Sequence, residues 1–157
     1  YKVEVSMTNE QLIELVNADL KNELKHLQFY LHASVMLQGL HRQELREYLA
    51  AEAASELTHC LQFAELVVHL GGVPEVVGNE FPSGVSCPVA ILKAAVEMEQ
   101  EVADNYAERL RQTEGLENAS TAYCHVFYEE QLADSQKAAW EVAQMVKQYD
   151  HEAGCEK

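Results

Sequence analysis

The sequence is poor in residues that interrupt helices. It has 3 prolines and 7 glycines among 157 residues, too few for a fold made of many short strands and tight turns. Apolar residues make up 48% of the chain, a fraction that excludes general disorder. The length is typical of one domain. We therefore expect a single all-α domain over residues 1–157, built from long helices.

Basic residues are scarce as well. Against 26 Asp and Glu there are 11 Lys and Arg, which gives a formal net charge of −15. Binding to nucleic acid needs a basic surface for the phosphates, so this composition argues against a nucleic-acid partner. A strongly acidic surface instead concentrates cations around the protein.

Long apolar runs and closely spaced cysteines are also missing. No run reaches the ~20 residues of a membrane-spanning helix, so we expect no membrane partner. The cysteines have neither the CxxC spacing of a zinc site nor the density of a secreted disulfide scaffold. A reducing, cytoplasmic location is therefore the expectation. The four cysteines are Cys60, Cys87, Cys124 and Cys155.

Apolar periodicity predicts four helices. Thr8 and Gln11 form a capping-box pattern at the start of the first helix. Gly71 is a C-terminal cap for the second, and Pro88 suits the first position of the third. Residues 73–87 form a long connection, whereas the other two connections are short. This plan is a four-helix bundle with one long crossover. The predicted helices span about residues 8–37, 43–70, 88–113 and 118–149.

Three of these helices each carry one glutamate on an apolar face. Helix neighbours three, four and seven residues away define a face, and by this test Glu23, Glu56 and Glu99 point at the core. A buried carboxylate is costly unless it is paired or bound to a metal. The face of Glu99 is otherwise made of Leu92, Ala95, Val96, Val102, Ala103, Tyr106 and Leu110.

Glu56 and His59 form a Glu-x-x-His motif, which places a carboxylate and an imidazole one turn apart on one face. Alone this spacing is common in helices by chance. Together with Glu23 and Glu99 it is the recurring di-iron carboxylate pattern of four-helix bundles. Mixed carboxylate and imidazole ligands suit iron or manganese better than structural zinc.

Three segments resemble bacterioferritins and the bacterioferritin-like miniferritins related to Dps: LVNADLKNELKHLQFYLHAS, AEAASELTHCLQFAELVVHLGGVP and AVEMEQEVADNYAERL. Glu23 and Glu99 each lie seven residues before a tyrosine, Tyr30 and Tyr106, as in that family. The resemblance covers about residues 10–149. It implies a ferritin-like bundle that oxidises Fe(II) with O2 or H2O2 at a di-iron site. It also implies storage of the ferric product in a hollow homo-oligomeric shell.

The predicted fourth helix departs from the family, because it has no second Glu-x-x-His motif. An apolar stripe through Cys124, Phe127, Ala138, Val142, Met145 and Tyr149 sets its register. This register turns Gln131 and Asp134 inward, and eukaryotic-type ferritins also carry a Gln on this helix. A half-turn rotation brings in Glu130 instead. One iron is then expected on Glu23, Glu56 and His59. Glu56 is expected to bridge to a second iron on Glu99 and a weaker fourth-helix ligand.

Several further residues have two readings each. Tyr30 either donates an electron during oxidation or fills the core. The Cys60 and Cys124 thiols either pair beside the site, as in some miniferritins, or are two small core residues.

The remaining candidates concern haem and the other histidines. Leu57 stands where haem-binding bacterioferritins have Met, so no haem is expected. The other histidines lack a clear metal partner at fixed spacing, and most of them are assigned to packing or the surface: His26, His32, His41, His69, His125 and His151.

The ends of the sequence favour a particular assembly. Residues 150–157, DHEAGCEK, leave little room for the short fifth helix of 24-subunit shells, so a 12-subunit shell is favoured. The first ten residues contain one Lys, which argues against DNA coating through a basic tail. Two alternatives stay open: a di-iron oxygenase or peroxidase of low oligomeric state, and a degenerate, metal-poor scaffold.

Overall fold

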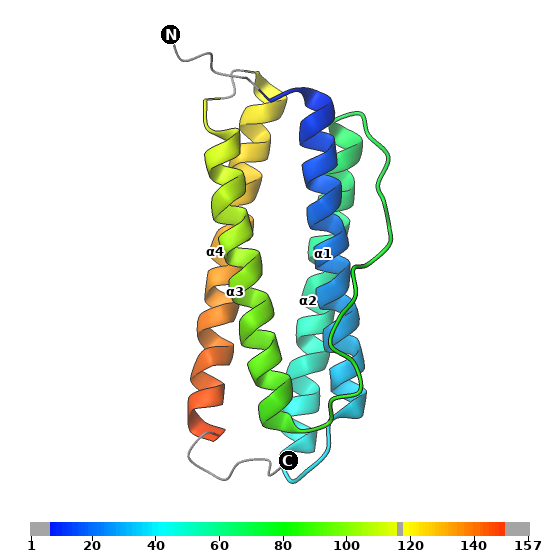
Figure 1. Cartoon of the computed structure of the whole chain (residues 1–157), viewed down its shortest axis with the longest axis vertical. Helices are drawn as coiled ribbons and strands as arrows, with labels where there is room; N and C mark the ends of the chain where they lie inside the picture. The colour runs from blue at the N-terminus through cyan, green and yellow to red at the C-terminus, as the bar shows by residue number, and fades with distance from the viewer. Residues whose placement is uncertain (1–6, 116–117, 150–157) are drawn as a thin grey trace.

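The computed structural model describes residues 7–115 and 118–149, and it is a bundle of four α-helices (Figure 1). No strand occurs within these ranges, so the all-α prediction is confirmed. Residues 150–157, whose sequence suggested a shell type, lie outside the described residues, as do residues 1–6 of the N-terminal arm. The helices are α1 (Asn9–Met36), α2 (Arg42–His69), α3 (Pro88–Thr113) and α4 (Ala119–Tyr149).

The helix ends form where the sequence signals place them. At the start of α1 the Thr8 side chain accepts a hydrogen bond from the Gln11 N–H, and the Gln11 side chain accepts one from the Thr8 N–H. This reciprocal capping box satisfies two backbone donors that a helix start leaves free. Gly71 follows α2 with a φ of 89°, a left-handed conformation that favours glycine. Pro88 opens α3.

The bundle consists of two hairpins, α1 with α2 and α3 with α4 (Figure 1). The long α2–α3 connection runs along the length of the bundle, so α2 and α3 point the same way. It is held to α1 by hydrogen bonds. The Asn17 side chain donates to the Val73 carbonyl at 3.1 Å and accepts from the Glu75 N–H at 2.9 Å. The Asn79 N–H donates to the Lys21 carbonyl at 3.1 Å. These bonds fix α1 against the connection.

A buried ion pair joins α1 to the second hairpin. Asp19 on α1 is 1% exposed and accepts from Arg109 Nε on α3 at 2.9 Å. It also accepts from Tyr128 Oη on α4 at 2.6 Å and from Asn105 Nδ2 on α3 at 2.7 Å. A buried charge is tolerated when its hydrogen bonds are satisfied in this way. The network therefore sets how the inner faces of three helices meet.

The core is divided into two apolar clusters with a polar layer between them. One cluster includes Leu12, Phe63 and Val102, and the other includes Phe29 and Ile91. On each helix at least one buried polar residue lies between the buried residues of the two clusters. The buried polar residues of this layer are Glu23, His26, Glu56, Glu99, Gln131 and Ser135. Within the described residues, none of the helices has the length and apolar character needed to cross a bilayer.

Candidate metal centre

Three helices place the three predicted glutamates in the polar layer. Glu23 comes from α1, Glu56 from α2 and Glu99 from α3, and they are 2%, 4% and 2% exposed. Their burial agrees with the apolar faces read from the sequence. Carboxylates this deep need a compensating charge or a cation.

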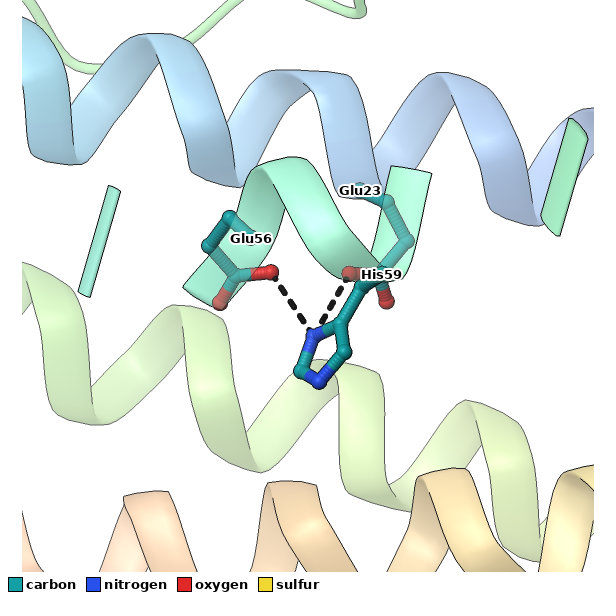
Figure 2. Close-up of side chains that lie close together, drawn as sticks. All are labelled: Glu23, Glu56 and His59. Atoms are coloured by element: carbon teal, nitrogen blue, oxygen red, sulfur yellow. Dashed lines mark hydrogen bonds and ion pairs between the residues drawn. The ribbon is translucent and has the colours of Figure 1, made fainter. Parts of the chain in front are cut away.

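A first cluster forms around His59 (Figure 2). Its Nδ1 lies 3.1 Å from Glu56 Oε2 and 3.5 Å from Glu23 Oε2. One ligand atom from each of these three residues lies within 4.8 Å of the others. Tyr106 on α3 donates a hydrogen bond to Glu23 Oε1. Two carboxylates and one imidazole thus converge on one point, as expected for a cation site.

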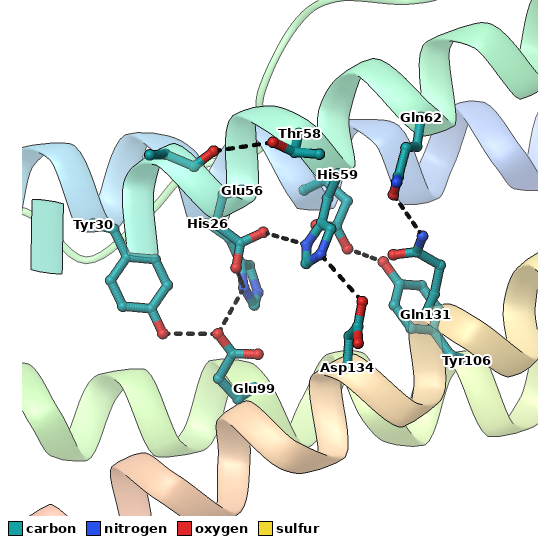
Figure 3. A network of polar contacts seen from close by, with 12 residues as sticks. His26, Tyr30, Glu56, Thr58, His59, Gln62, Glu99, Tyr106, Gln131 and Asp134 are labelled. Carbon is teal, nitrogen blue, oxygen red and sulfur yellow. Dashed lines mark hydrogen bonds and ion pairs between the residues drawn. The ribbon is translucent and has the colours of Figure 1, made fainter. Parts of the chain in front are cut away.

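A second cluster lies next to the first and includes His26, for which the sequence pattern gave no metal partner (Figure 3). His26 Nδ1 lies 3.8 Å from Glu56 Oε1 and 3.7 Å from Glu99 Oε1. These three residues also offer ligand atoms within 4.8 Å of one another. Tyr30 Oη donates to Glu99 Oε1 at 2.7 Å. Glu56 therefore turns one carboxylate oxygen to each cluster.

The expectation that His26 lacks a metal-ligating partner is not met, because its ring is 1% exposed and faces two carboxylates. A signal was present in the sequence. Glu23 and His26 have the same Glu-x-x-His spacing as Glu56 and His59. The family pattern has its two Glu-x-x-His motifs on the second and fourth helices, so it assigns no such motif to α1.

The charges of the layer are mutually dependent. Burial and the neighbouring charge of Glu56 raise the pKa of Glu23 to about 8. Burial disfavours the charged form of His59, but its contacts with Glu23 and Glu56 outweigh burial and raise its pKa to about 10. Burial acts the same way on His26, whose pKa is raised to about 10 by Glu56 and Glu99. Burial raises the pKa of Glu56, but the two histidines outweigh it and hold the pKa below its usual range.

Protons therefore balance the carboxylate charge of the layer at neutral pH. A cation that binds here has to displace protons from the imidazoles before their nitrogens can act as ligands. The donor set of carboxylate oxygens and imidazole nitrogens fits iron.

The fourth helix supplies less than the sequence suggests. Gln131 is 3% exposed, as the chosen register requires, but its Nε2 donates to Gln62 Oε1 at 2.9 Å. The Asp134 side chain is 65% exposed and lies 3.8 Å from His59 Nε2. Glu130 is exposed, so the half-turn alternative does not describe α4.

The reason is a one-residue drift of the inward stripe on α4. After Gln131 the buried positions are Ser135 and Ala139, so Ser135 faces inward and Asp134 lies on the flank. The buried positions after Gln131 follow at spacings of four residues, whereas the prediction used a spacing of three, from Gln131 to Asp134. Ala138, which the prediction placed in the stripe, is partly exposed.

Cys60 and Cys124 are both buried and both free. The pairing suggested by the family resemblance is therefore absent, and the alternative of two small core residues describes the structure. Burial raises the pKa of Cys60 to about 12 and that of Cys124 to about 11, so both thiols are protonated at neutral pH.

A cavity of about 240 Å³ between α2, α3 and α4 reaches both clusters. Glu56, His59 and Glu99 line it together with Glu52 and Glu141. Burial, followed by the charges of Glu99 and Glu56, raises the pKa of Glu52 to about 7.

The family model of the ferritin-like domain matches residues 13–151. The chain therefore belongs to the ferritin-like family, as the resemblance predicted. No curated protein sequence matches the chain. The fold is similar to that of a ferritin-like diiron-carboxylate protein from Bacillus anthracis. The two share 26% identity over 89% of this chain and 99% of that one, with a TM-score of 0.79.

Two further solved structures have the same fold at lower identity. A Dps protein from Vibrio cholerae has a TM-score of 0.80 and 12% identity, covering 88% of this chain and 90% of that one. A dodecameric thioferritin from Bacteroides fragilis has a TM-score of 0.64 and 20% identity, covering 92% of this chain and 93% of that one.

Proposed function

We propose that this protein oxidises Fe(II) at a two-cation centre within each chain and stores the ferric product in a homo-oligomeric shell. The observation that carries the proposal is the position of Glu56. Its two carboxylate oxygens face two adjacent clusters, each with a second carboxylate and an imidazole. A carboxylate shared in this way holds two cations close enough to react with one oxidant.

The layer suits Fe(II) as a substrate. Its donors match those that iron prefers, and an apolar cluster packs on either side of the layer. Two Fe(II) ions supply two electrons, which reduce O2 with two protons to H2O2, or H2O2 with two protons to water. The imidazole protons displaced on binding are a local source of those protons. The cavity lined by Glu56, His59 and Glu99 gives Fe(II) a path to the layer and the ferric product a path out.

The storage part of the proposal rests on the family and on charge. The net charge of −15 favours the collection of cations inside a hollow assembly. The relative from Bacteroides fragilis is described as dodecameric. A shell of 12 subunits is the form we propose for this chain.

Native mass spectrometry combined with aerobic Fe(II) oxidation tests the proposal. The expected result is a large homo-oligomer that forms ferric product far faster than buffer alone. E99Q should slow this oxidation at least tenfold. E97Q is the matched control, because Glu97 is exposed on the same helix two residues away, and it should behave as wild type. A monomer or dimer would contradict storage, and equal rates for E99Q and wild type would contradict the site.

A further inference from the structure

The second cluster contains an imidazole from α1, and this inference rests on the proposed two-cation centre. We infer that His26 is a ligand of the second cation, together with Glu56 and Glu99. Helices α1, α2 and α3 then supply both cation positions, and α4 supplies neither. This replaces the weak fourth-helix ligand that the sequence suggested.

The distances around His26 support a cation between the three groups. The Nδ1 separations of 3.8 Å from Glu56 and 3.7 Å from Glu99 are too long for hydrogen bonds. Two atoms that each lie about 2.1 Å from one metal ion are themselves about 3 to 4 Å apart. Figure 3 places the His26 ring beside both carboxylates, in the layer that also holds His59. The spacing is thus that of ligands around an ion.

The topology explains why an α1 histidine can reach this place. Glu23 with His26 on α1 repeats the Glu-x-x-His spacing of Glu56 with His59 on α2. Because α1 and α2 are antiparallel neighbours, the two histidines are displaced from their glutamates in opposite directions along the bundle. His59 therefore meets Glu23, and His26 meets Glu56. The histidine of each motif thus contacts the glutamate of the motif on the other helix.

The side chains of α4 leave this position to His26. Gln131 is bonded to Gln62, and Glu130 is exposed. Asp134 lies 3.8 Å from Nε2 of His59, the ring nitrogen that does not face the glutamates of the first cluster. Without His26 the second cluster would have carboxylates alone. With His26 the two positions have equal donor sets, so we expect two cations of similar affinity.

The competing interpretation is that His26 is a permanent imidazolium that replaces the second cation. Both interpretations place a positive charge between Glu56 and Glu99, but they differ in the metal count. Zn(II) is a suitable probe because it does not change oxidation state and accepts carboxylate and imidazole ligands. The assembled, full-length protein is stripped with a chelator and dialysed against Zn(II), and the bound zinc is measured by atomic emission.

We expect two tightly bound zinc ions per wild-type chain, one for H26N and one for H59N. H32N is the matched control, since His32 on the same helix accepts a hydrogen bond from the Gly84 N–H and lies outside both clusters. It should keep two. One zinc in wild type would overturn the inference and identify His26 as the counter-ion. Two zinc ions in H26N, or loss of one in D134N, would overturn it in favour of α4. If wild type bound no zinc tightly and did not oxidise Fe(II), the result would contradict the proposed function itself.

If H26N does not fold, a crystal structure of the zinc-loaded wild-type protein still tests whether His26 is a ligand. Anomalous diffraction at the zinc edge should place a zinc ion about 2.0–2.1 Å from a ring nitrogen of His26. A zinc ion bound by Glu56 and Glu99 with the His26 ring outside bonding distance would contradict the inference.

Discussion

Tyr30 donates a 2.7 Å hydrogen bond to Glu99, joining α1 to α3 at the edge of the second cluster. Both side chains are buried, at 1% and 2% exposed. Burial, with the adjacent Glu99 charge, raises the pKa of Tyr30 well above its ordinary value, so the hydroxyl stays protonated and remains a donor. The bond holds one Glu99 oxygen in place, which links the core-filling and catalytic readings of this tyrosine.

The variant Y30F separates those readings. Losing a hydrogen bond to a charged group costs about 1.5–3 kcal/mol of stability, and both readings predict this loss. If Tyr30 only positions Glu99, zinc binding should weaken and Fe(II) oxidation should slow by roughly the same factor. If it also donates an electron, zinc affinity should change little and oxidation should slow about tenfold or more. Y123F, at an exposed tyrosine on α4, is the control. A Y30F protein identical to wild type in stability, zinc affinity and rate of Fe(II) oxidation would contradict any role for the bond.

The metal-free protein should lose stability as the pH rises from about 6.5 to 10. The folded pKa values of His26 and His59 are raised to about 10, so their stabilising contribution is complete below the unfolded value of 6.5 and is lost progressively as the pH rises from 6.5 through about 10. Glu23, with its pKa raised to about 8, loses its contribution in the same direction between pH 4.5 and 8. Urea unfolding of the chelated protein at pH 6.5 and pH 9 measures this. The fall should be smaller in H59N, and a rise in stability with pH in wild type would contradict the charge assignment.

The buried ion pair of Arg109 and Asp19 should be worth far more than a surface pair on the same helix. R109M leaves the Asp19 carboxylate buried with one fewer partner, and removing one member of such a pair typically costs about 3–5 kcal/mol. Arg111 pairs with Glu108 at the surface, with its side chain 67% exposed, so R111M should change stability by less than about 1 kcal/mol. Urea denaturation of both variants gives the comparison. Equal losses would show that the buried network does not organise the bundle.

Cys60 and Cys124 should resist alkylation in the folded protein. Both thiols are buried and protonated, and the thiolate is the reactive form. After unfolding without reductant, both should be alkylated, as read by peptide mass spectrometry. A peptide linking the two that disappears only after reduction would contradict the free thiols.

The fold could be predicted from the sequence because its signals are local and agree with one another. Caps at Thr8 and Gly71, a proline at the start of α3 and one long connection fix four helices and their order. The three glutamates of the centre were also readable, because an acid on an apolar helix face is conspicuous. Each of these features depends on residues within about two turns of one another.

The remaining parts of the centre depend on relations between helices. His26 joins Glu56 and Glu99 only because α1 and α2 are antiparallel at a particular height, which a single-helix pattern does not contain. The position of Asp134 changes with a drift of one residue in the α4 stripe, and periodicity does not resolve so small a rotation. The family pattern, which has its second motif on the fourth helix, also does not predict a histidine ligand on α1.

The number of Fe(II) ions oxidised in the first turnover tests the central claim most directly. Anaerobically loaded protein is mixed with O2 in a stopped-flow instrument, and the fast formation of ferric product is followed against the amount of added Fe(II). The account predicts a fast phase that saturates at two Fe(II) per chain in wild type and is lost in E56Q. E65Q, at an exposed glutamate of the same helix, should keep it. A fast phase that E56Q retains, or oxidation no faster than in buffer, would contradict the account.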